Sequence, residues 1–382
     1  MSAYTDPADG SKYSLNEPRW RSDAGRPLWI GPGPGIARDD IDQSTNSLWR
    51  YRLALPVKVH SPISLGEGRT PLVRADWEDR SSPLLKLDFL NPSGSFKDRG
   101  TSVLFSYLRQ LGITSVLEDS SGNGGSSAAA YGAAGGLDVT VFAPASTSPS
   151  KITQVRAYGA KVELVPGPRS ASQDEAIRSS TSQRFYASHN WQPFFLQGTK
   201  TLAYELWEDL GFQTPDNVIV PVGAGSSLLG CWLGFQELMN SGQISSMPRL
   251  FAAQPLNCSP VDASFTAGTD KPVDRPVLPT VAEGTSISHP LRLVQMVAAL
   301  RETRGASVAV TESEAIRALS SLCDRGFFVE PTSAVAAAAF SQLLDRGTIG
   351  RREKTVVLLT GSGLKSAQTV VDLLGRGHVA SP

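Results

Sequence analysis

The residues with the clearest potential for chemistry lie in a loop of small residues, NPSGSFKDRG, at positions 91–100. Lys97 in this loop is followed directly by Asp98 and Arg99. Because Gly and Ser let a backbone approach another molecule closely, we expect a ligand at Lys97, with Asp98 capping a helix that starts there. A lysine amine whose pKa is lowered by burial or by neighbouring charges can form a Schiff base with a carbonyl compound.

Three further turns rich in Gly and Ser follow apolar runs, namely SSGNGGSS (120–127), VGAGSS (222–227) and TGSGLK (360–365). In open sheets of parallel strands, ligands bind at the carboxyl ends of strands and at the amino ends of the following helices. VGAGSS offers backbone N–H groups and two hydroxyls to a phosphate, but it matches neither the Walker spacing nor a GxGxxG fingerprint. An Asn amide can bond a phenolic oxygen, and a Ser or Thr hydroxyl can meet a pyridine nitrogen. Lysine, phosphate cradle, amide and hydroxyl together are what pyridoxal 5′-phosphate (PLP) requires.

The elements that must position these turns alternate between strand and helix. Short apolar runs that end in Gly, Ser or Pro predict buried strands. They are 83–89, 114–121, 139–145, 161–167, 217–223, 249–255 and 355–361. Helical periodicity or small-residue composition predicts helices at 101–112, 126–136, 200–211 and 313–326. This alternation favours an α/β fold with mainly parallel sheets.

The bulk composition favours a globular protein with a small-molecule ligand. Lys plus Arg and Asp plus Glu each total 36, so no basic excess points to nucleic acid or to a membrane surface. No apolar run reaches the roughly 20 residues of a membrane span, and the N-terminus has no export-signal pattern. The three cysteines and four histidines are scattered without metal-ligand spacing, so we expect no metal site and a reducing cytoplasm.

With the four turns in view, the chain resembles the fold-type II PLP enzymes, the tryptophan synthase β-like group, and within it threonine synthase. The segments SLWRYRLALPV (47–57), SLGEGRTPLV (64–73) and FFVEPTSA (327–334) also resemble that family. The resemblance implies two three-layer α/β/α subdomains with the cofactor in the cleft between them. It further implies an N-terminal extension at 1–45, a large cofactor-binding domain at 46–100 and 200–382, and a small substrate-carboxylate domain at 101–199.

The same resemblance implies a role for each turn. Lys97 maps onto the Schiff-base lysine, and the family's carboxylate-binding loop, which also bonds the cofactor O3′ through Asn123, maps onto Ser120, Ser121, Asn123 and Gly124. The phosphate-binding turn maps onto Gly223, Ala224, Gly225, Ser226 and Ser227. The hydroxyl at the pyridine nitrogen maps onto Thr360, with Ser362 as the second choice. A homodimer acting on a small amino-acid substrate is implied as well.

Three segments depart from the family pattern. One is the phosphate turn, which has Ser226 and Ser227 where the family more usually has a Gly-Asn pair. Residues 6–28 keep the Gly, Tyr and Leu spacing of a paired-cysteine knuckle without any cysteine. In QPFFLQGTKT (192–201), Phe195 stands where the family carries an Arg that holds the substrate phosphate. A phenyl ring cannot make a bidentate phosphate contact.

The leading interpretation is therefore a threonine synthase-like lyase, which would make threonine from O-phosphohomoserine and water. The alternative keeps PLP and changes the substrate, as in a threonine or serine dehydratase, a diaminopropionate ammonia-lyase or a cysteate synthase-like enzyme. A non-catalytic PLP-fold protein and a nucleotide-binding α/β protein are weaker alternatives, because the first has no need of all four turns and the second lacks a fingerprint. Without the resemblance, His189, His289 and Cys231 are expected to be structural, HNWQPFF (189–195) core or cleft wall, and Lys200 a surface residue.

Overall fold

The computed structural model describes residues 2–77 and 81–375. The chain forms two compact units, and its path passes between them several times. Unit 1 comprises residues 1–69, 91–205 and 230–246, and unit 2 comprises 70–90, 206–229 and 247–382. The domain boundaries predicted from the sequence divide the chain at other positions than these units, and they stay a prediction.

Unit 1 is built around a four-stranded parallel sheet with the order β7-β6-β5-β8. Its strands are β5 (Ser115–Glu118), β6 (Asp138–Pro144), β7 (Lys161–Val165) and β8 (Phe185–Tyr186). The central residues Val116, Leu117 and Val141 are fully buried, as expected for a parallel sheet covered on both faces.

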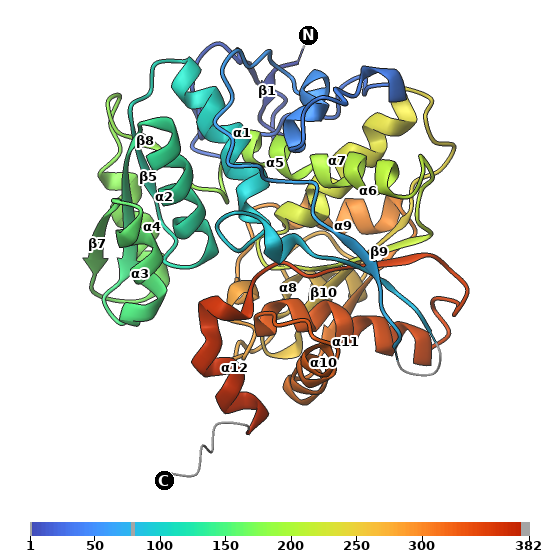
Figure 1. The fold of residues 1–382 in the computed structure, drawn as a ribbon. Helices are drawn as coiled ribbons and strands as arrows, with labels where there is room; N and C mark the ends of the chain where they lie inside the picture. Colours follow the sequence, from blue (N-terminus) through green and yellow to red (C-terminus); the bar gives the residue numbers. More distant parts are fainter. Residues whose placement is uncertain (1, 78–80, 376–382) are drawn as a thin grey trace. The chain divides into compact units, whose positions relative to one another are not determined.

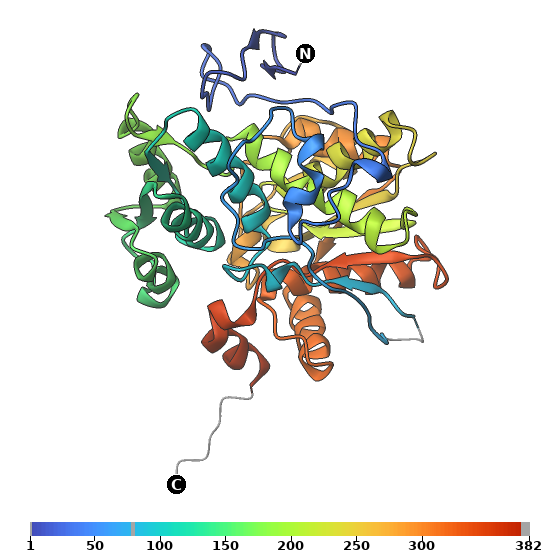
Figure 2. The same cartoon turned by 45° about the horizontal axis from the view of Figure 1, so that its top comes forward.

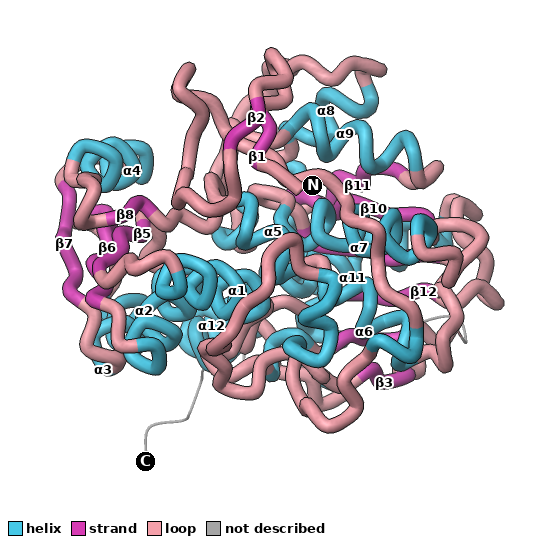
Figure 3. The backbone as a smooth tube through the Cα atoms, turned by 90° about the horizontal axis from the view of Figure 1, so that it is seen from above, coloured by secondary structure: helices cyan, strands magenta, loops and turns pink. Residues whose placement is uncertain are grey.

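The chain reverses direction within this sheet. From β5 it steps to β6 and β7, and it then returns to β8 on the other side of β5. Because crossovers between parallel strands are right-handed, the reversal places the last helix on the opposite face from the first two. Figure 3 shows α4 (Arg169–Arg178) on one face, with α2 (Asn123–Gly135) and α3 (Pro149–Ala157) on the other. The carboxyl ends of β5 and β8 thus form a topological switch point, where ligands of α/β proteins bind.

Helices α1 (Lys97–Gln110) and α5 (Pro193–Thr199) pack against each other in unit 1, and α6 (Thr201–Asp209) follows α5. Two 3₁₀ helices precede them, η1 (Arg38–Asp40) and η2 (Leu48–Ala54). The N-terminal segment carries the short antiparallel pair β1 (Tyr4–Thr5) and β2 (Lys12–Tyr13), visible in dark blue in Figure 2. The Tyr4 hydroxyl lies 2.8 Å from that of Tyr107 on α1, so this segment joins the core of its unit.

Unit 2 contains a six-stranded sheet with the order β11-β10-β9-β12-β4-β3. Its strands are β3 (Leu72–Arg74), β4 (Leu84–Lys86), β9 (Asn217–Pro221), β10 (Arg249–Pro255), β11 (Ala306–Val310) and β12 (Thr355–Leu358). All neighbours are parallel except β3 against β4. From β9 the chain steps outward to β10 and β11 and then returns to β12, so a second switch point lies between β9 and β12.

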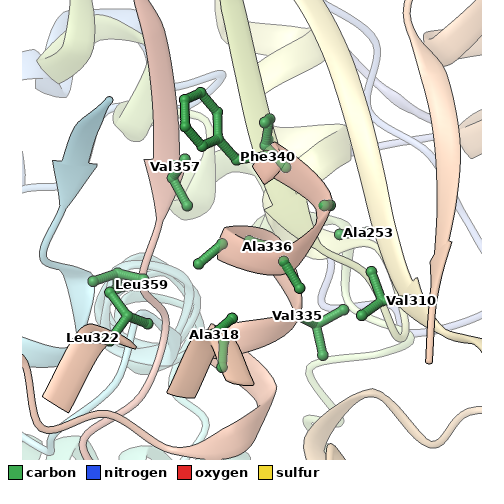
Figure 4. Packing of buried hydrophobic residues seen from close by; sticks show 14 of the residues in the cluster. Ala253, Val310, Ala318, Leu322, Val335, Ala336, Phe340, Val357 and Leu359 are labelled. Carbon is green, nitrogen blue, oxygen red and sulfur yellow. The ribbon is translucent and has the colours of Figure 1, made fainter. Parts of the chain in front are cut away.

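Helices cover this second sheet. Those that contact its strands are α8 (Pro260–Thr266), α9 (Leu293–Glu302) and α11 (Pro331–Asp345). Helix α10 (Glu312–Asp324) packs against α11 and α12 (Ala367–Leu374), and α7 (Ser226–Asn240) starts in unit 2. Four short 3₁₀ helices lie in the connections: η4 (Asp88–Leu90) after β4, η5 (Leu256–Cys258) before α8, η6 (Glu283–Thr285) between α8 and α9, and η7 (Gly363–Ser366) before α12. Figure 1 shows α10 and α11 below the strands and α9 above them. Figure 4 shows Phe340 of α11 beside Val357 of β12 and Ala336 of α11 on the side of Ala253 of β10, all within one buried apolar cluster.

The α/β fold predicted from the sequence is confirmed, and each of the seven predicted strands is present within about two residues of its expected start. The prediction missed β11, whose run ASVAV was not recognised, and the very short strands β1, β2, β3 and β8. Over residues 2–77 and 81–375, no helix is both long and apolar enough to cross a membrane.

Candidate active site

Lys97 is the first residue of α1, and two aromatic rings flank its amine. The Nζ atom lies 4.7 Å from the ring centre of Phe96 and 5.6 Å from that of Phe195. The faces of aromatic rings attract a cation electrostatically and replace part of its water shell. The chain therefore places this amine at the start of a helix in partly desolvated surroundings.

Asp98 anchors the Lys97 loop and does not cap α1. Its Oδ2 accepts from the Ser93 backbone N–H at 2.6 Å, and its Oδ1 accepts from the hydroxyls of Ser93 (2.5 Å) and Ser127 (2.6 Å). The helix begins at Lys97, two residues earlier than a cap at Asp98 would require, so the predicted capping role is wrong. Since Ser127 belongs to α2, the buried carboxylate ties the loop before Lys97 to the helix that follows the Asn123 turn.

Arg99 holds the other side of the loop. Its Nη1 and Nη2 donate to Oε2 and Oε1 of Glu205 at 2.8 and 2.9 Å, with both side chains almost completely buried. The Arg69 backbone N–H also donates to Oε2 of Glu205 at 2.8 Å. Such a bidentate pair fixes both position and orientation. Asp98 and Arg99 thus explain why charged residues follow Lys97: each immobilises one side of its helix start.

Two glycines permit the close approach of α1 and α5. A Cβ atom on Gly100 would lie 2.5 Å from the Phe195 ring, and one on Gly198 would lie 2.1 Å from the Arg99 carbonyl oxygen. The Phe195 ring consequently lies flat against Gly100 and is 1% exposed. The expected core or wall position of residues 189–195 is confirmed for Trp191, Phe194 and Phe195.

The predicted carboxylate loop occupies the switch point of unit 1. Ser120 and Ser121 follow β5, and α2 begins at Asn123. A Cβ on Gly125 would lie 1.9 Å from the Ser120 carbonyl oxygen, so this tight turn requires glycine at that position. Its location at the amino end of a 13-residue helix suits an anionic group.

A buried pair of ionisable residues, Glu118 and His189, lies directly beneath this loop. His189 Nδ1 is 2.9 Å from Glu118 Oε1, and the His189 backbone N–H donates to Glu118 Oε2 at 3.2 Å. Burial raises the pKa of Glu118 to about 7. Burial, together with the positive charge of Lys97, holds the pKa of His189 well below its usual value. The nearby Asp119 carboxylate accepts from the Ser188 hydroxyl at 2.6 Å, and burial raises its pKa as well.

The Glu118–His189 pair could not be predicted from the sequence, because the partners are 71 positions apart. The available signal was topological. Glu118 is the last residue of β5, and His189 lies three positions after β8. That β5 and β8 are neighbours in the sheet is known only from the strand order.

The predicted phosphate turn of unit 2 lies at the carboxyl end of β9, and α7 begins within it at Ser226. Gly225 has φ +83°, and a Cβ there would lie 2.0 Å from Met296 Sδ. A Cβ on Gly223 would lie 2.9 Å from the Thr285 Cα. Both glycines are therefore required by their own surroundings. The first backbone N–H groups of α7 lie at the end of this turn, where they can stabilise an anion.

Thr360 follows β12 at the same switch point of unit 2. The Ser333 hydroxyl accepts from the backbone N–H groups of Thr360 and Gly361 at 2.9 and 3.1 Å. Ser333 Oγ also lies 3.2 Å from Thr360 Oγ1. Ser333, which the sequence reading did not single out within FFVEPTSA, thus orients the hydroxyl predicted to face the pyridine nitrogen.

The side chains of these turns fit a phosphorylated pyridine cofactor. Within the described chain, the buried hydroxyls of Ser95 in the Lys97 loop and Ser227 in the phosphate turn have no hydrogen-bond partner. Orphaned buried hydroxyls are costly unless a ligand or water completes them. The structure brings Lys97, Ser120, Ser121, Asn123 and Gly124 into unit 1, and the 223–227 turn and Thr360 into unit 2.

Lys200 is not a surface residue, contrary to the expectation from its sequence context alone. It is 1% exposed, and its Nζ donates to Glu237 Oε1 at 2.7 Å and to the Ala54 carbonyl at 2.8 Å. Burial lowers the pKa of its ammonium, while Glu237 opposes that shift. Glu237 also accepts from the Tyr204 hydroxyl at 2.8 Å, so Lys200 is part of a buried structural network.

The cysteine-free knuckle is held by a side-chain cation. Arg26 Nε donates to Asp6 Oδ2 at 2.8 Å, and its Nη2 donates to Asp9. The Ser22 hydroxyl accepts from the Arg26 backbone N–H at 3.2 Å. In the described parts of the chain, no three His, Cys, Asp or Glu side chains are grouped so that they could bind a metal ion.

Comparisons with known proteins show the family to which this chain is similar. The profile of the family described as pyridoxal-phosphate dependent enzyme matches residues 63–361. The chain is 33% identical to a threonine synthase of Methanosarcina acetivorans over 88% of this chain and 85% of that one. It is equally identical to a threonine synthase of Methanocaldococcus jannaschii over the same shares. A fungal L-serine ammonia-lyase from Rhizomucor miehei superposes with a TM-score of 0.71 at 21% identity, covering 81% of this chain and 99% of that one.

Proposed function

This chain belongs to the pyridoxal-phosphate dependent enzymes, as a threonine synthase-like lyase, and we propose that it converts an amino-acid substrate by elimination and replacement at Lys97. The observation that carries the assignment of the site is the position of Lys97. Its amine lies between two aromatic rings at the start of α1, and its charge acts on the pair beneath the Ser120–Gly124 loop.

In this proposal each turn has one task. Lys97 binds the cofactor covalently, and Asn123 holds the oxygen on its ring. Gly223, Ala224, Gly225, Ser226 and Ser227 would bind its phosphate, and the Thr360 hydroxyl would bond its pyridine nitrogen. A neutral hydroxyl at that nitrogen leaves it largely unprotonated, which suits elimination better than transamination.

The substrate carboxylate would lie on Ser120, Ser121, Asn123 and Gly124 at the amino end of α2. Holding the carboxylate there fixes which bond of the α carbon is broken. The bound cofactor supplies an electron sink for the α carbon. The Lys97 Nζ would take the α proton of the substrate as general base.

The test uses the purified, PLP-loaded protein. Lys97→Ala should lose the visible absorbance of the covalently bound cofactor and lower kcat by about 10²-fold to 10⁴-fold, the usual contribution of a positioned base. Lys58→Ala, which changes an exposed lysine of the same unit, is the matched control. Unchanged absorbance and turnover in Lys97→Ala would overturn the assignment.

The proposed substrate is O-phosphohomoserine, with phosphate as the leaving group and threonine as the product. The names of the curated relatives support it. Titration with this compound should shift the cofactor spectrum and release phosphate and threonine in equal amounts. A spectrum that does not respond would leave the cofactor assignment intact and remove this substrate.

Phe195 favours a second candidate, a β-eliminase or β-replacement enzyme. The buried phenyl ring of Phe195, 5.6 Å from the Lys97 amine, offers no hydrogen bond to a substrate phosphate. A substrate with a small uncharged side chain needs no such hydrogen bond and can lie against the ring. Serine, threonine, phosphoserine and diaminopropionate should therefore be assayed for keto-acid formation. Keto acid from serine or threonine, with no phosphate from O-phosphohomoserine, would select this candidate.

The family resemblance also supports a homodimer in the cytoplasm. Light scattering of the protein as it elutes from a size-exclusion column measures the mass of the assembly, which is compared with the 40.7 kDa mass of one chain. Cell fractionation with an antibody to the protein tests the location.

A further inference from the structure

We propose that His189 is a positioning residue for the substrate-carboxylate loop Ser120–Gly124, and that Glu118 determines which nitrogen of its imidazole carries the proton. This inference rests on the proposed function only for the identity of the loop's ligand. It assigns a role to two buried groups that the proposed chemistry does not otherwise use.

Contact geometry is the first support. A Cβ on Gly124 would lie 2.7 Å from both Cε1 and Nδ1 of His189, so the imidazole packs directly against the Gly124 backbone. The ring is 8% exposed and lies 5.6 Å from the ring of Phe195, which borders Lys97. The imidazole therefore supports the loop from below, and a change in its position moves Gly124.

Glu118 fixes the imidazole in turn. Its carboxylate meets the His189 side chain through Oε1 and the His189 backbone through Oε2. The Asp119 backbone N–H donates to the same Oε1 at 3.1 Å. Glu118 therefore joins the end of β5 to the segment after β8 across the switch point.

The pair has two neutral-imidazole states. When Glu118 is ionised, Nδ1–H donates to it and Nε2 is an acceptor; when Glu118 is protonated, its O–H donates to Nδ1 and Nε2–H is a donor. The two states differ by one proton taken from solvent. Across the described chain no hydrogen bond is formed by His189 Nε2, so this nitrogen is available to a bound molecule.

Burial places the exchange near neutrality, and the positive charges of Lys97 and Arg169 oppose part of its effect on the pKa of Glu118. Besides each other, the pair faces Lys97, Asp119, Arg169 and Tyr186. Burial raises the pKa of Glu118 to about 7, and burial together with Lys97 keeps the pKa of His189 well below its usual value. The imidazole thus stays uncharged while the carboxyl titrates, and Nε2 changes from donor to acceptor as the pH rises through about 7.

The decisive experiment observes the imidazole itself. The chain has four histidines, so ¹⁵N-histidine labelling of the PLP-loaded protein gives few signals, and His189→Gln assigns the one of interest. We expect the protonated nitrogen of His189 to change from Nε2 at pH 6 to Nδ1 at pH 8.5. In Glu118→Gln, an isosteric variant without ionisation, the tautomer should no longer depend on pH. Glu163→Gln, on strand β7 of the same sheet, is the control that should leave the exchange unchanged. Titration of His189 to an imidazolium near its usual pKa, identical in both variants, would overturn the proposal.

The second measurement concerns ligand binding. Spectral titration with L-2-aminobutyrate, an amino acid without a leaving group, reports binding of the carboxylate independently of turnover. His189→Gln should weaken this binding about 10-fold to 100-fold, the loss expected when hydrogen bonds to a charged group are misplaced. The control His60→Gln, an exposed histidine of the same unit, should leave it unchanged. Unchanged binding in His189→Gln would overturn the positioning role even if O-phosphohomoserine proves not to be the substrate.

Discussion

The buried pair of Arg99 and Glu205 allows a quantitative prediction about the stability of unit 1. Both side chains are essentially inaccessible to solvent, and two hydrogen bonds of 2.8 and 2.9 Å join them. Two unit charges about 4 Å apart attract by about 4 kcal/mol at an effective dielectric constant near 20. Arg99→Met keeps most of the side-chain volume. It removes both guanidinium hydrogen bonds from the Glu205 carboxylate, which still accepts from the Arg69 backbone N–H.

Removing one partner of a buried pair costs about 3–5 kcal/mol, because the remaining charge stays buried. Arg99→Met should therefore lower the free energy of unfolding by that amount in urea titrations followed by far-UV circular dichroism. The double variant Arg99→Met with Glu205→Met should lose less than the single variant, since no buried charge remains. The Arg69 backbone N–H then loses its acceptor, at a cost of about 1–3 kcal/mol.

The control is the exposed pair of Arg178 and Glu175 on α4, whose side chains are 71% and 36% exposed. Exposed pairs contribute at most about 1 kcal/mol, so Arg178→Met should change the stability little. A loss below about 1 kcal/mol in Arg99→Met, or a double variant less stable than the single one, would refute the assignment of Arg99 as an anchor of the Lys97 helix.

Three further predictions concern the turns and the pair beneath them. Glu118 keeps its proton to about pH 7 when folded, against an ordinary value of 4.5, so folding stability should fall by about 3 kcal/mol as the pH rises from 4.5 past 7. Urea titrations at pH 5 and 8 measure this change in stability, and Glu118→Gln should remove the part of it that Glu118 causes. The same difference in stability between the two pH values in Glu118→Gln would contradict the prediction. Gly225→Ala should weaken PLP binding at least about 10-fold, because its φ is +83° and its Cβ would overlap Met296. The loss in the free energy of unfolding should exceed the roughly 1–2 kcal/mol that φ strain costs by itself. Gly242→Ala, at φ +70° in open space, measures the effect of φ strain alone on the free energy of unfolding, and an equal loss of unfolding free energy in Gly225→Ala would exclude the steric cause. Asp98→Ala should lower kcat about 10-fold or more by loosening the Lys97 loop, and unimpaired turnover would show that the loop holds without it.

Several features near the site were misjudged or missed for one physical reason. Lys200 reads as a surface residue because its neighbours in sequence, Thr199 and Thr201, are polar. Its burial depends on Glu237, 37 positions away, which supplies the charge that a buried ammonium needs. Ser333 and Thr360 are 27 positions apart and meet because α11 and β12 are neighbours in the fold.

By itself the sequence determined the parts of this protein that are encoded in contiguous residues. Apolar runs ending in small residues predicted the strands, and the glycines and hydroxyls after them predicted the four turns, because strand ends and tight turns depend on local backbone preferences. Lys97 was recognisable for the same reason. Only the tertiary structure decided which turns share a switch point, since strand order is not written in any one segment. It alone brought Glu118 to His189 and Arg99 to Glu205, because the free energy of a buried charge is set by partners that the fold, and not the neighbouring sequence, supplies.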